Sequence, residues 1–153
     1  MRFHLIDRID AWTPNVRIAG RKVTSAAEEF WLHTDRGTVM PPHLVLESLC
    51  QAGTWLVMLS TDHRRRAALL SVGEVWFGGD VRPGDVLRLD AEITSLSDDA
   101  AVLDGTVAAA AGGEQVVLRA TGIMCALIEG ARLDDPEATR RMAEQLMGAG
   151  AAR

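Results

Sequence analysis

The sequence has few cysteines, no excess of basic residues and no long uninterrupted apolar run. Its two cysteines, Cys50 and Cys125, lie in apolar segments, which is typical of small buried side chains in a reducing compartment and not of a disulfide framework. A net charge of -5 argues against a general nucleic-acid-binding protein. No run reaches the ~20 apolar residues of a membrane span, and the N-terminus lacks the apolar core of a signal peptide. These absences predict a cytoplasmic protein that binds neither nucleic acid nor membrane.

The 153 residues are enough for one domain with a real hydrophobic core. Residues 44–60, "LVLESLCQAGTWLVMLS", predict a long helix, because they are good helix formers and follow prolines at 41 and 42, where a first turn tolerates them. The helix is apolar on nearly every face. It should therefore be buried on most sides.

The pattern then changes to period two, most clearly in "VLRLDAEI", where Leu87, Leu89, Ala91 and Ile93 alternate with charged residues. "ALLSVGEVWF" precedes this strand, and "AAVLDGTVAAA" and "EQVVLRATGIMCALI" follow it. The short connections predict an antiparallel meander of these four strands. Two shorter strands are expected in "FHLIDRIDAW" and "VRIAGRKVT". The predicted fold class is α+β, with an antiparallel sheet wrapped around one long helix.

The C-terminal segment predicts a second, exposed helix with Asp135 as N-cap, Pro136 at the first position and Gly148 just past the end. Ala138, Met142 and Leu146 would form its apolar stripe, and residues 149–153 are expected to fray. We expect a main domain over residues 1–130 and a helical extension with a tail over residues 131–153.

One basic run, residues 63–66 ("HRRR"), follows the long helix. It fits a solvated loop, and it also fits a docking patch for an acidic partner. The sequence leaves both interpretations open.

Glu47 raises a functional question because it lies in an otherwise apolar helix. An ionised carboxylate in such a setting needs a partner or takes up a proton, and Gln51, one turn later, can hydrogen-bond to it. Alternatively, Glu47 simply points to solvent near the helix start, where the helix dipole favours negative charge. His33 lies upstream of that start. Together, an imidazole and a buried carboxylic acid form a competent pair for proton abstraction beside a carbonyl.

Three motifs occur in a characteristic order: "FHLIDRI", then "H-x5-VMP-x5-E-x3-Q", then "F-x3-V-x-PGD-x-L" from Phe77 to Leu87. In order and spacing they resemble the FabZ-type 3-hydroxyacyl-[acyl-carrier-protein] dehydratases, over about residues 3–127. The resemblance implies a hotdog fold that pairs into dimers, either homodimers or heterodimers with another hotdog subunit.

The resemblance also implies the site residues. His33 falls at the family's catalytic histidine and Glu47 at its catalytic acid, and in the family the two come from opposite subunits. The implied reaction is loss of water from a 3-hydroxyacyl thioester on the phosphopantetheine of an acyl carrier protein, in fatty-acid or polyketide/polyene-type biosynthesis. It needs no metal and no further cofactor. The implied substrate-binding residues are Val39, Met40, Pro42, Gln51, Trp76 and Phe77.

Two departures from the family pattern lie at the site. The family's "G-H-F-P-G" reads "L-H-T-D-R" over residues 32–36, and its "V-M-P-G" reads "V-M-P-P". Pro42 thus replaces a glycine whose N-H normally faces the thioester oxygen, and proline has no such donor. Because a first helical turn has further free donors, the N-H of His43 is the expected replacement.

Two other functions remain possible on these residues. The altered loop and Pro42 also fit a non-catalytic or half-active acyl-binding subunit of a hotdog heterodimer. A hotdog thioesterase, in which an acidic helix residue directs water to the thioester, is a third alternative. The pairing of His33 with Glu47 favours the dehydratase.

Overall fold

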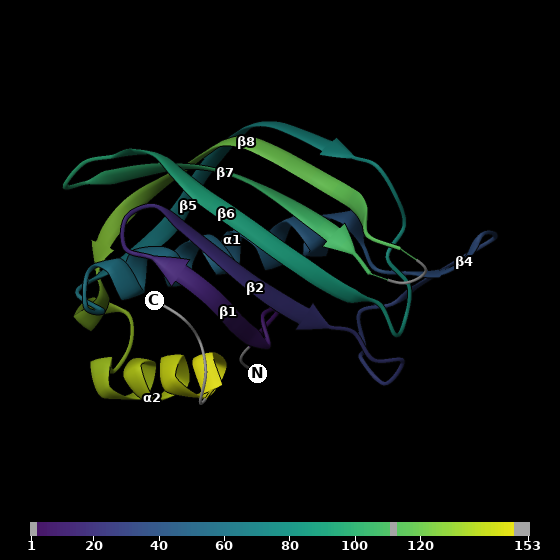
Figure 1. Ribbon diagram of the computed structural model, residues 1–153, viewed down its shortest axis with the longest axis horizontal. Helices are drawn as coiled ribbons and strands as arrows, with labels where there is room; N and C mark the ends of the chain where they lie inside the picture. Colours follow the sequence, from purple (N-terminus) through teal and green to yellow (C-terminus); the bar gives the residue numbers. More distant parts are fainter. Residues whose placement is uncertain (1–2, 111–112, 149–153) are drawn as a thin grey trace.

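A six-stranded antiparallel sheet curves around one long helix in the computed structural model, which describes residues 3–110 and 113–148 (Figure 1). In chain order the elements are β1 (Arg8–Thr13), β2 (Arg17–Val23), β3 (Leu32–Thr34), β4 (Gly37–Val39), α1 (Pro42–Ser60), β5 (Arg65–Phe77), β6 (Val86–Leu96), β7 (Ala100–Ala109), β8 (Gln115–Glu129), the short 3-10 helix η1 (Gly130–Arg132) and α2 (Pro136–Met147). The predicted α+β class, with a sheet wrapped around a helix, is confirmed.

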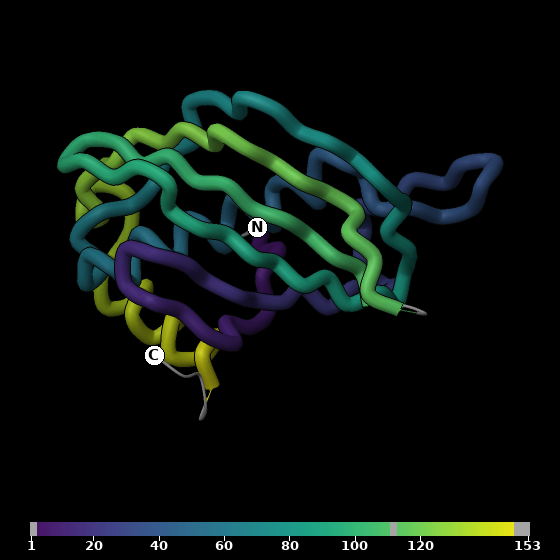
Figure 2. Tube along the Cα trace, turned by 45° about the horizontal axis from the view of Figure 1, so that its top comes forward, coloured from purple at the N-terminus to yellow at the C-terminus, as the bar shows by residue number. Residues whose placement is uncertain are grey.

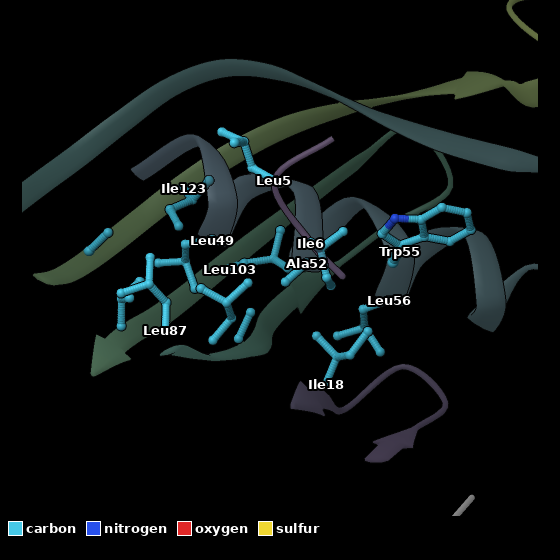
Figure 3. Close-up of a cluster of buried hydrophobic side chains, with 14 of the residues drawn as sticks. Leu5, Ile6, Ile18, Leu49, Ala52, Trp55, Leu56, Leu87, Leu103 and Ile123 are labelled. Atoms are coloured by element: carbon cyan, nitrogen blue, oxygen red, sulfur yellow. The ribbon is translucent and has the colours of Figure 1, made fainter. Parts of the chain in front are cut away.

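Helix α1 begins at the proline pair, as predicted. Pro41 is the N-cap residue and Pro42 the first helical residue. Nine of its 19 residues are buried, so the helix is covered on most sides. Figure 3 shows Leu49, Ala52 and Leu56 of α1 among side chains of the surrounding strands. The apolar sequence of α1 thus supplies the centre of the core, to which each buried leucine contributes about 1.5–3 kcal/mol.

The order of strands in the sheet is β1-β2-β6-β7-β8-β5. The two strands ahead of the helix, β1 and β2, and the meander of β6, β7 and β8 agree with the prediction, although β1 begins at Arg8 and not at Phe3. The placement of β5 does not, because β5 pairs with β8 and not with β6, with Val72 opposite Ile123. The predicted four-strand meander was therefore wrong at its first strand.

The connection between β5 and β6 explains this difference. Strands β5 and β6 run antiparallel, so the chain needs no full crossover to join them. Three strand spacings separate them by about 14 Å, and the eight intervening residues, 78–85, can span up to ~26 Å. The backbone N-H of Gly78 donates to Val117 O (2.8 Å), which holds this crossing segment against the end of β8. A short connection therefore does not prove that two strands are neighbours.

Strand β5 forms one edge of the six-stranded sheet and is 13 residues long. Leu69 and Leu70 are 50% and 62% exposed, and Trp76 and Phe77 are about half exposed. A long edge strand with exposed apolar side chains is a surface on which another chain can pair.

Helix α2 has the predicted caps. The side chain of Asp135 accepts a hydrogen bond from Glu137 N, and Gly148 follows the last turn with a φ of 57°. However, the helix packs on the body of the protein, where Ala143 and Leu146 are buried. Ala138 and Met142 of the predicted stripe are half-buried. Residues 149–153, which the sequence predicts to fray, lie outside the described residues.

The basic run after α1 is partly engaged inside the protein. Arg66 forms an ion pair with Asp134, and the Nε of Arg64 donates to Thr61 O (3.0 Å). Burial lowers the pKa of His63, with a further lowering from Arg140 that Asp62 opposes. Only part of the run is therefore available to an acidic partner. Across residues 3–110 and 113–148, no helix is long and apolar enough to cross a membrane.

Candidate functional site

His33 lies on a small hairpin made by β3 and β4, where it is opposite Thr38. Gly37 closes the two-residue turn with a φ of 110°, a conformation that glycine adopts without strain. The imidazole is exposed, and its Nδ1 lies 3.0 Å from the hydroxyl oxygen of Thr38. If Nδ1 donates its proton to this hydroxyl, Nε2 keeps the lone pair that a general base needs.

The hairpin of β3 and β4 projects from one end of the molecule in both views (Figures 1 and 2). Its turn is tied to the crossing segment, because the Nη2 of Arg82 donates to Arg36 O (3.2 Å). His33 thus lies on a projecting hairpin whose turn is attached to the crossing segment.

Glu47 is in the second turn of α1 and is half-buried. Its Oε1 accepts a hydrogen bond from the Nε2 of Gln51 (2.9 Å). Gln51 is itself held at both ends of its amide, since its Oε1 accepts from Leu5 N (2.8 Å) and its Nε2 also donates to Phe3 O (3.1 Å). The amide therefore fixes the Glu47 carboxyl, and the predicted contact between the two side chains is present.

The start of α1 has very few free backbone donors. Neither Pro41 nor Pro42 has an N-H, and the N-H of Leu44 already donates to Pro41 O (2.9 Å). His43, whose side chain is exposed, is the one residue of this first turn whose N-H has no acceptor within the described part of the chain. Its position fits the predicted replacement for the missing glycine donor.

The "V-x-PGD" motif, residues 81–85, is hydrogen-bonded to the residue that precedes this helix start. Met40 N donates to Val81 O (2.8 Å), which attaches the residue before the proline pair to the crossing segment. Within that segment the Oδ2 of Asp85 accepts from Arg82 N (2.8 Å), and the hydroxyl of Thr24 donates to Asp85 O (2.8 Å). Val81 and Asp85 are buried. The motif thus has a structural role, which is to fix the position of the first turn of α1.

A cavity of about 400 Å³ lies along the face of α1 that carries Glu47. Its walls come from four parts of the chain: the segment before β1, helix α1, the first half of β5, and the segment that leads into and includes α2. The lining residues are Phe3, His4, Glu47, Cys50, Gln51, Thr54, Trp55, Met58, Arg66, Ala67, Leu69, Asp134, Ala138, Thr139 and Met142. Polar and apolar side chains both line it.

The cavity brings together two of the residues singled out from the sequence, Glu47 and Gln51. It does not include His33, His43 or Pro42. Sequence reasoning missed the contributions of Cys50, Thr54 and Met58. They follow Glu47 by three, seven and eleven residues, which places them on its face of the helix, and this signal was available.

The remaining predicted substrate-binding residues lie elsewhere. Val39 and Met40 are buried, and Met40 belongs to the hydrophobic core. Trp76 and Phe77 stand at the end of β5, where the guanidinium of Arg119 lies 5.4 Å from the centre of the Trp76 ring. Within one protomer these four side chains do not line the cavity beside Glu47.

Both cysteines are free thiols. Burial raises the pKa of Cys50 to about 12, and the nearby Glu47 and Cys125 add to this rise. Burial also raises the pKa of Cys125. Cys50 therefore lines the cavity as a neutral, weakly nucleophilic group. Cys125 is buried as predicted, whereas Cys50 is half-buried.

Comparison with known proteins places this arrangement in a family context. A family model described as "FabA-like domain" matches residues 1–121. Three relatives are 3-hydroxyacyl-[acyl-carrier-protein] dehydratases FabZ. That of Chloroflexus aggregans is 36% identical over 96 residues, which cover 61% of this chain and 67% of the relative. That of a Caulobacter species is 34% identical over 96 residues, covering 60% and 59%. That of Lactococcus lactis is 34% identical over 107 residues, covering 65% and 71%.

Solved structures resemble the whole fold. A Streptococcus mutans protein crystallised bound to acetyl-CoA superimposes with a TM-score of 0.65 at 15% identity, over 85% of this chain and 94% of that one. A thioesterase family protein from Silicibacter pomeroyi gives a TM-score of 0.65 at 18% identity, over 82% and 87%. At these identities the similarity concerns the fold alone, and it confirms the hotdog fold.

Proposed function

The chain belongs to the FabA-like domain family, and we propose that it converts a 3-hydroxyacyl thioester on an acyl carrier protein to the 2-enoyl thioester. The proposal rests above all on one observation. Glu47 lines a cavity next to a fixed amide, and His33, at the family position of the base, is exposed on a projecting hairpin. FabZ dehydratases are its relatives at about 35% identity.

The chemistry divides between the two side chains. The Nε2 of His33 takes the proton from C2 of the acyl chain, and the resulting negative charge moves onto the thioester oxygen. The carboxyl of Glu47 then gives its proton to the C3 hydroxyl, whose C-O bond breaks so that water leaves and a C2-C3 double bond forms. The N-H of His43, at the positive end of the helix dipole, stabilises the charged oxygen.

The site is shared between two hotdog subunits in this proposal. His33 is absent from the lining of the cavity that contains Glu47, and its hairpin projects away from the domain. The long exposed edge of β5 offers a surface for the second subunit. Pairing there would bring the arm of one subunit towards the cavity of the other. A lone protomer would then contain both groups but no complete site.

The proposed substrate carrier, pathway and compartment are taken from the same family resemblance. The substrate is carried on the phosphopantetheine of an acyl carrier protein, and the pathway is fatty-acid or polyketide/polyene-type biosynthesis in the cytoplasm. The side chains proposed to meet the substrate beyond the cavity are Val39, Met40, Pro42, Trp76 and Phe77.

A second candidate function is favoured by the helix start. With prolines at 41 and 42, a single N-H without an acceptor among residues 3–110 and 113–148 remains where the first turn of a helix normally offers several. A half-active or non-catalytic acyl-binding subunit, completed by a different hotdog chain, fits this reduced donor set. This heterodimer alternative predicts turnover only when the second chain is present.

The test uses purified protein and 3-hydroxyacyl groups loaded on a carrier protein, with the products identified by mass spectrometry. Loss of one water from the acyl chain is the expected result, and His33→Ala or Glu47→Gln should abolish it. Glu144→Gln, on the exposed side of α2, is the matched control and should leave the rate unchanged. Release of free acid would establish a thioesterase instead. Turnover that requires a co-expressed second hotdog chain would establish the heterodimer.

A further inference from the structure

The cavity beside Glu47 extends well beyond the carboxyl. Its floor is one face of α1, on which Glu47, Gln51, Thr54 and Met58 follow one another at helical spacing. Met58 follows Glu47 by 11 positions, which corresponds to a groove of roughly 16 Å at a rise of about 1.5 Å per residue. A carboxyl at one end of such a groove leaves room for a chain that continues away from the reacting carbon.

The outer wall of this groove is the C-terminal helix. Ala138, Thr139 and Met142 of α2 line it together with Asp134, which precedes the helix. All four residues lie beyond residue 121, where the family match ends. An element outside the family match therefore shapes the space next to the proposed catalytic acid.

The two ends of the groove differ in character. Beyond Glu47 the lining includes the apolar side chains of Trp55, Met58 and Met142. At the end away from Glu47, Arg66 forms an ion pair with Asp134, and both side chains keep more than a third of their surface exposed. A guanidinium has five N-H donors, and a single pair to a carboxylate oxygen leaves others available.

From this arrangement we infer that the groove holds the acyl chain of the thioester, and that its far end selects chains carrying a hydroxyl or keto oxygen. The inference rests on the proposed function for the identity of the thioester. A terminal methyl group at this end would cover the guanidinium of Arg66 without replacing its bonds to water. An oxygen at the same place accepts a hydrogen bond from the guanidinium. The hydroxyl of Thr139 already donates to Asp135 O (3.1 Å) and does not serve as this donor. Met142 and Ala138 then set the width of the passage through which the chain reaches this end.

The test compares binding of two non-reacting probes, which keeps it independent of dehydration. Both are acyl amides of pantetheine of equal chain length. One carries a hydroxyl at the far end, and the other ends in a methyl group. Calorimetry should show about tenfold tighter binding of the hydroxylated probe to the wild type, the value of one hydrogen bond. Arg66→Met should reduce this preference towards unity.

A second pair of variants tests the wall. Ala138→Trp should block the groove, weakening both long probes at least tenfold while leaving a short probe that ends before Thr54 unchanged. Gln145→Trp, on the exposed face of the same helix, is the matched control and should change neither.

Equal affinity of the wild type for the two long probes would overturn the selection of oxygenated chains. The groove is not an acyl site if Ala138→Trp binds the long probes as tightly as the wild type does. The same conclusion follows if the wild type binds the long probes weakly and forms a stable dimer in which the partner fills the groove. Dehydration of long substrates at an undiminished rate by Ala138→Trp would leave the proposed function standing and reject this inference alone. Selective binding of the probes without dehydration would do the reverse.

Discussion

A site shared between subunits makes a strong prediction about mixed dimers. If His33 of one subunit works with Glu47 of its partner, a dimer of one His33→Ala chain and one Glu47→Gln chain contains one intact site and one doubly damaged site. Each variant alone contains none. Co-expressing the two chains with different affinity tags, and purifying through both tags in turn, isolates the mixed dimer.

The expected rates follow from the number of intact sites. Loss of a general acid or base costs about 10²- to 10⁴-fold, so each homodimeric variant should be nearly inactive. In a two-fold symmetric dimer with two equivalent sites, the purified mixed dimer should recover about half of the wild-type rate. The assay is release of water from a 3-hydroxyacyl carrier protein under saturating substrate.

The matched control places both substitutions in the same chain. A dimer of wild type with the His33→Ala/Glu47→Gln double variant has no intact shared site and should be inactive. If each protomer instead used its own two side chains, this second dimer would keep half the rate and the first would have none. That reversed result would refute the shared site.

Three further predictions concern individual residues. His43→Pro removes the free N-H of the first turn and should lower kcat by about 10²- to 10³-fold in steady-state kinetics. His43→Ala keeps the donor and should stay close to wild type. Equal losses of kcat in the two variants would contradict the backbone role. Because the pKa of Cys50 is raised to about 12, only about one thiol in 10⁴ is ionised at pH 8. Iodoacetamide should therefore label Cys50 far more slowly than free cysteine, and the labelling rate should increase as the pH rises. Labelling at the rate of free cysteine would contradict this prediction. A Cβ at Gly105 would lie 2.6 Å from Asp90 O and 2.8 Å from Leu49 Cδ1. Gly105→Ala should therefore reduce the free energy of unfolding, measured in urea, by about 1–3 kcal/mol. In the control Gly79→Ala the nearest contact of the new Cβ is 3.4 Å, and the free energy of unfolding should change by less than about 0.5 kcal/mol.

The sequence predicts both helices well, because their signals are local. The proline pair marks the start of α1, and Asp135 and Gly148 mark the two ends of α2. Each of these residues acts through its own backbone or on an N-H two positions away. Such effects do not depend on the rest of the fold.

The placement of β5 depends on residues far apart in the chain and was predicted wrongly. Alternation of apolar and polar residues tells which face of a strand is buried, but not which strand lies beside it. The pairing of Val72 with Ile123 is decided by the fit of whole strands over the helix. The hairpin of β3 and β4 is a different case, because two strands of three residues are too short to show any period.

The candidate site divides in the same way. Spacing within α1 predicts the contact of Gln51 with Glu47, which the structure contains. It cannot predict that Asp134 and Met142 meet the same cavity, because an apolar stripe on α2 does not identify the surface that it covers. The roles of His33, Glu47 and His43 stay predictions until the kinetic tests are made.

The hydrogen bond between Met40 N and Val81 O has a practical consequence for mutational scanning. Substitutions at Val81, Asp85 or Thr24 would displace the first turn of α1 and so reduce turnover, although none of the three lines the cavity beside Glu47. A map of activity-sensitive positions would therefore overstate the footprint of the ligand. Affinity measurements on the same variants would separate the scaffold from the surface that the ligand touches.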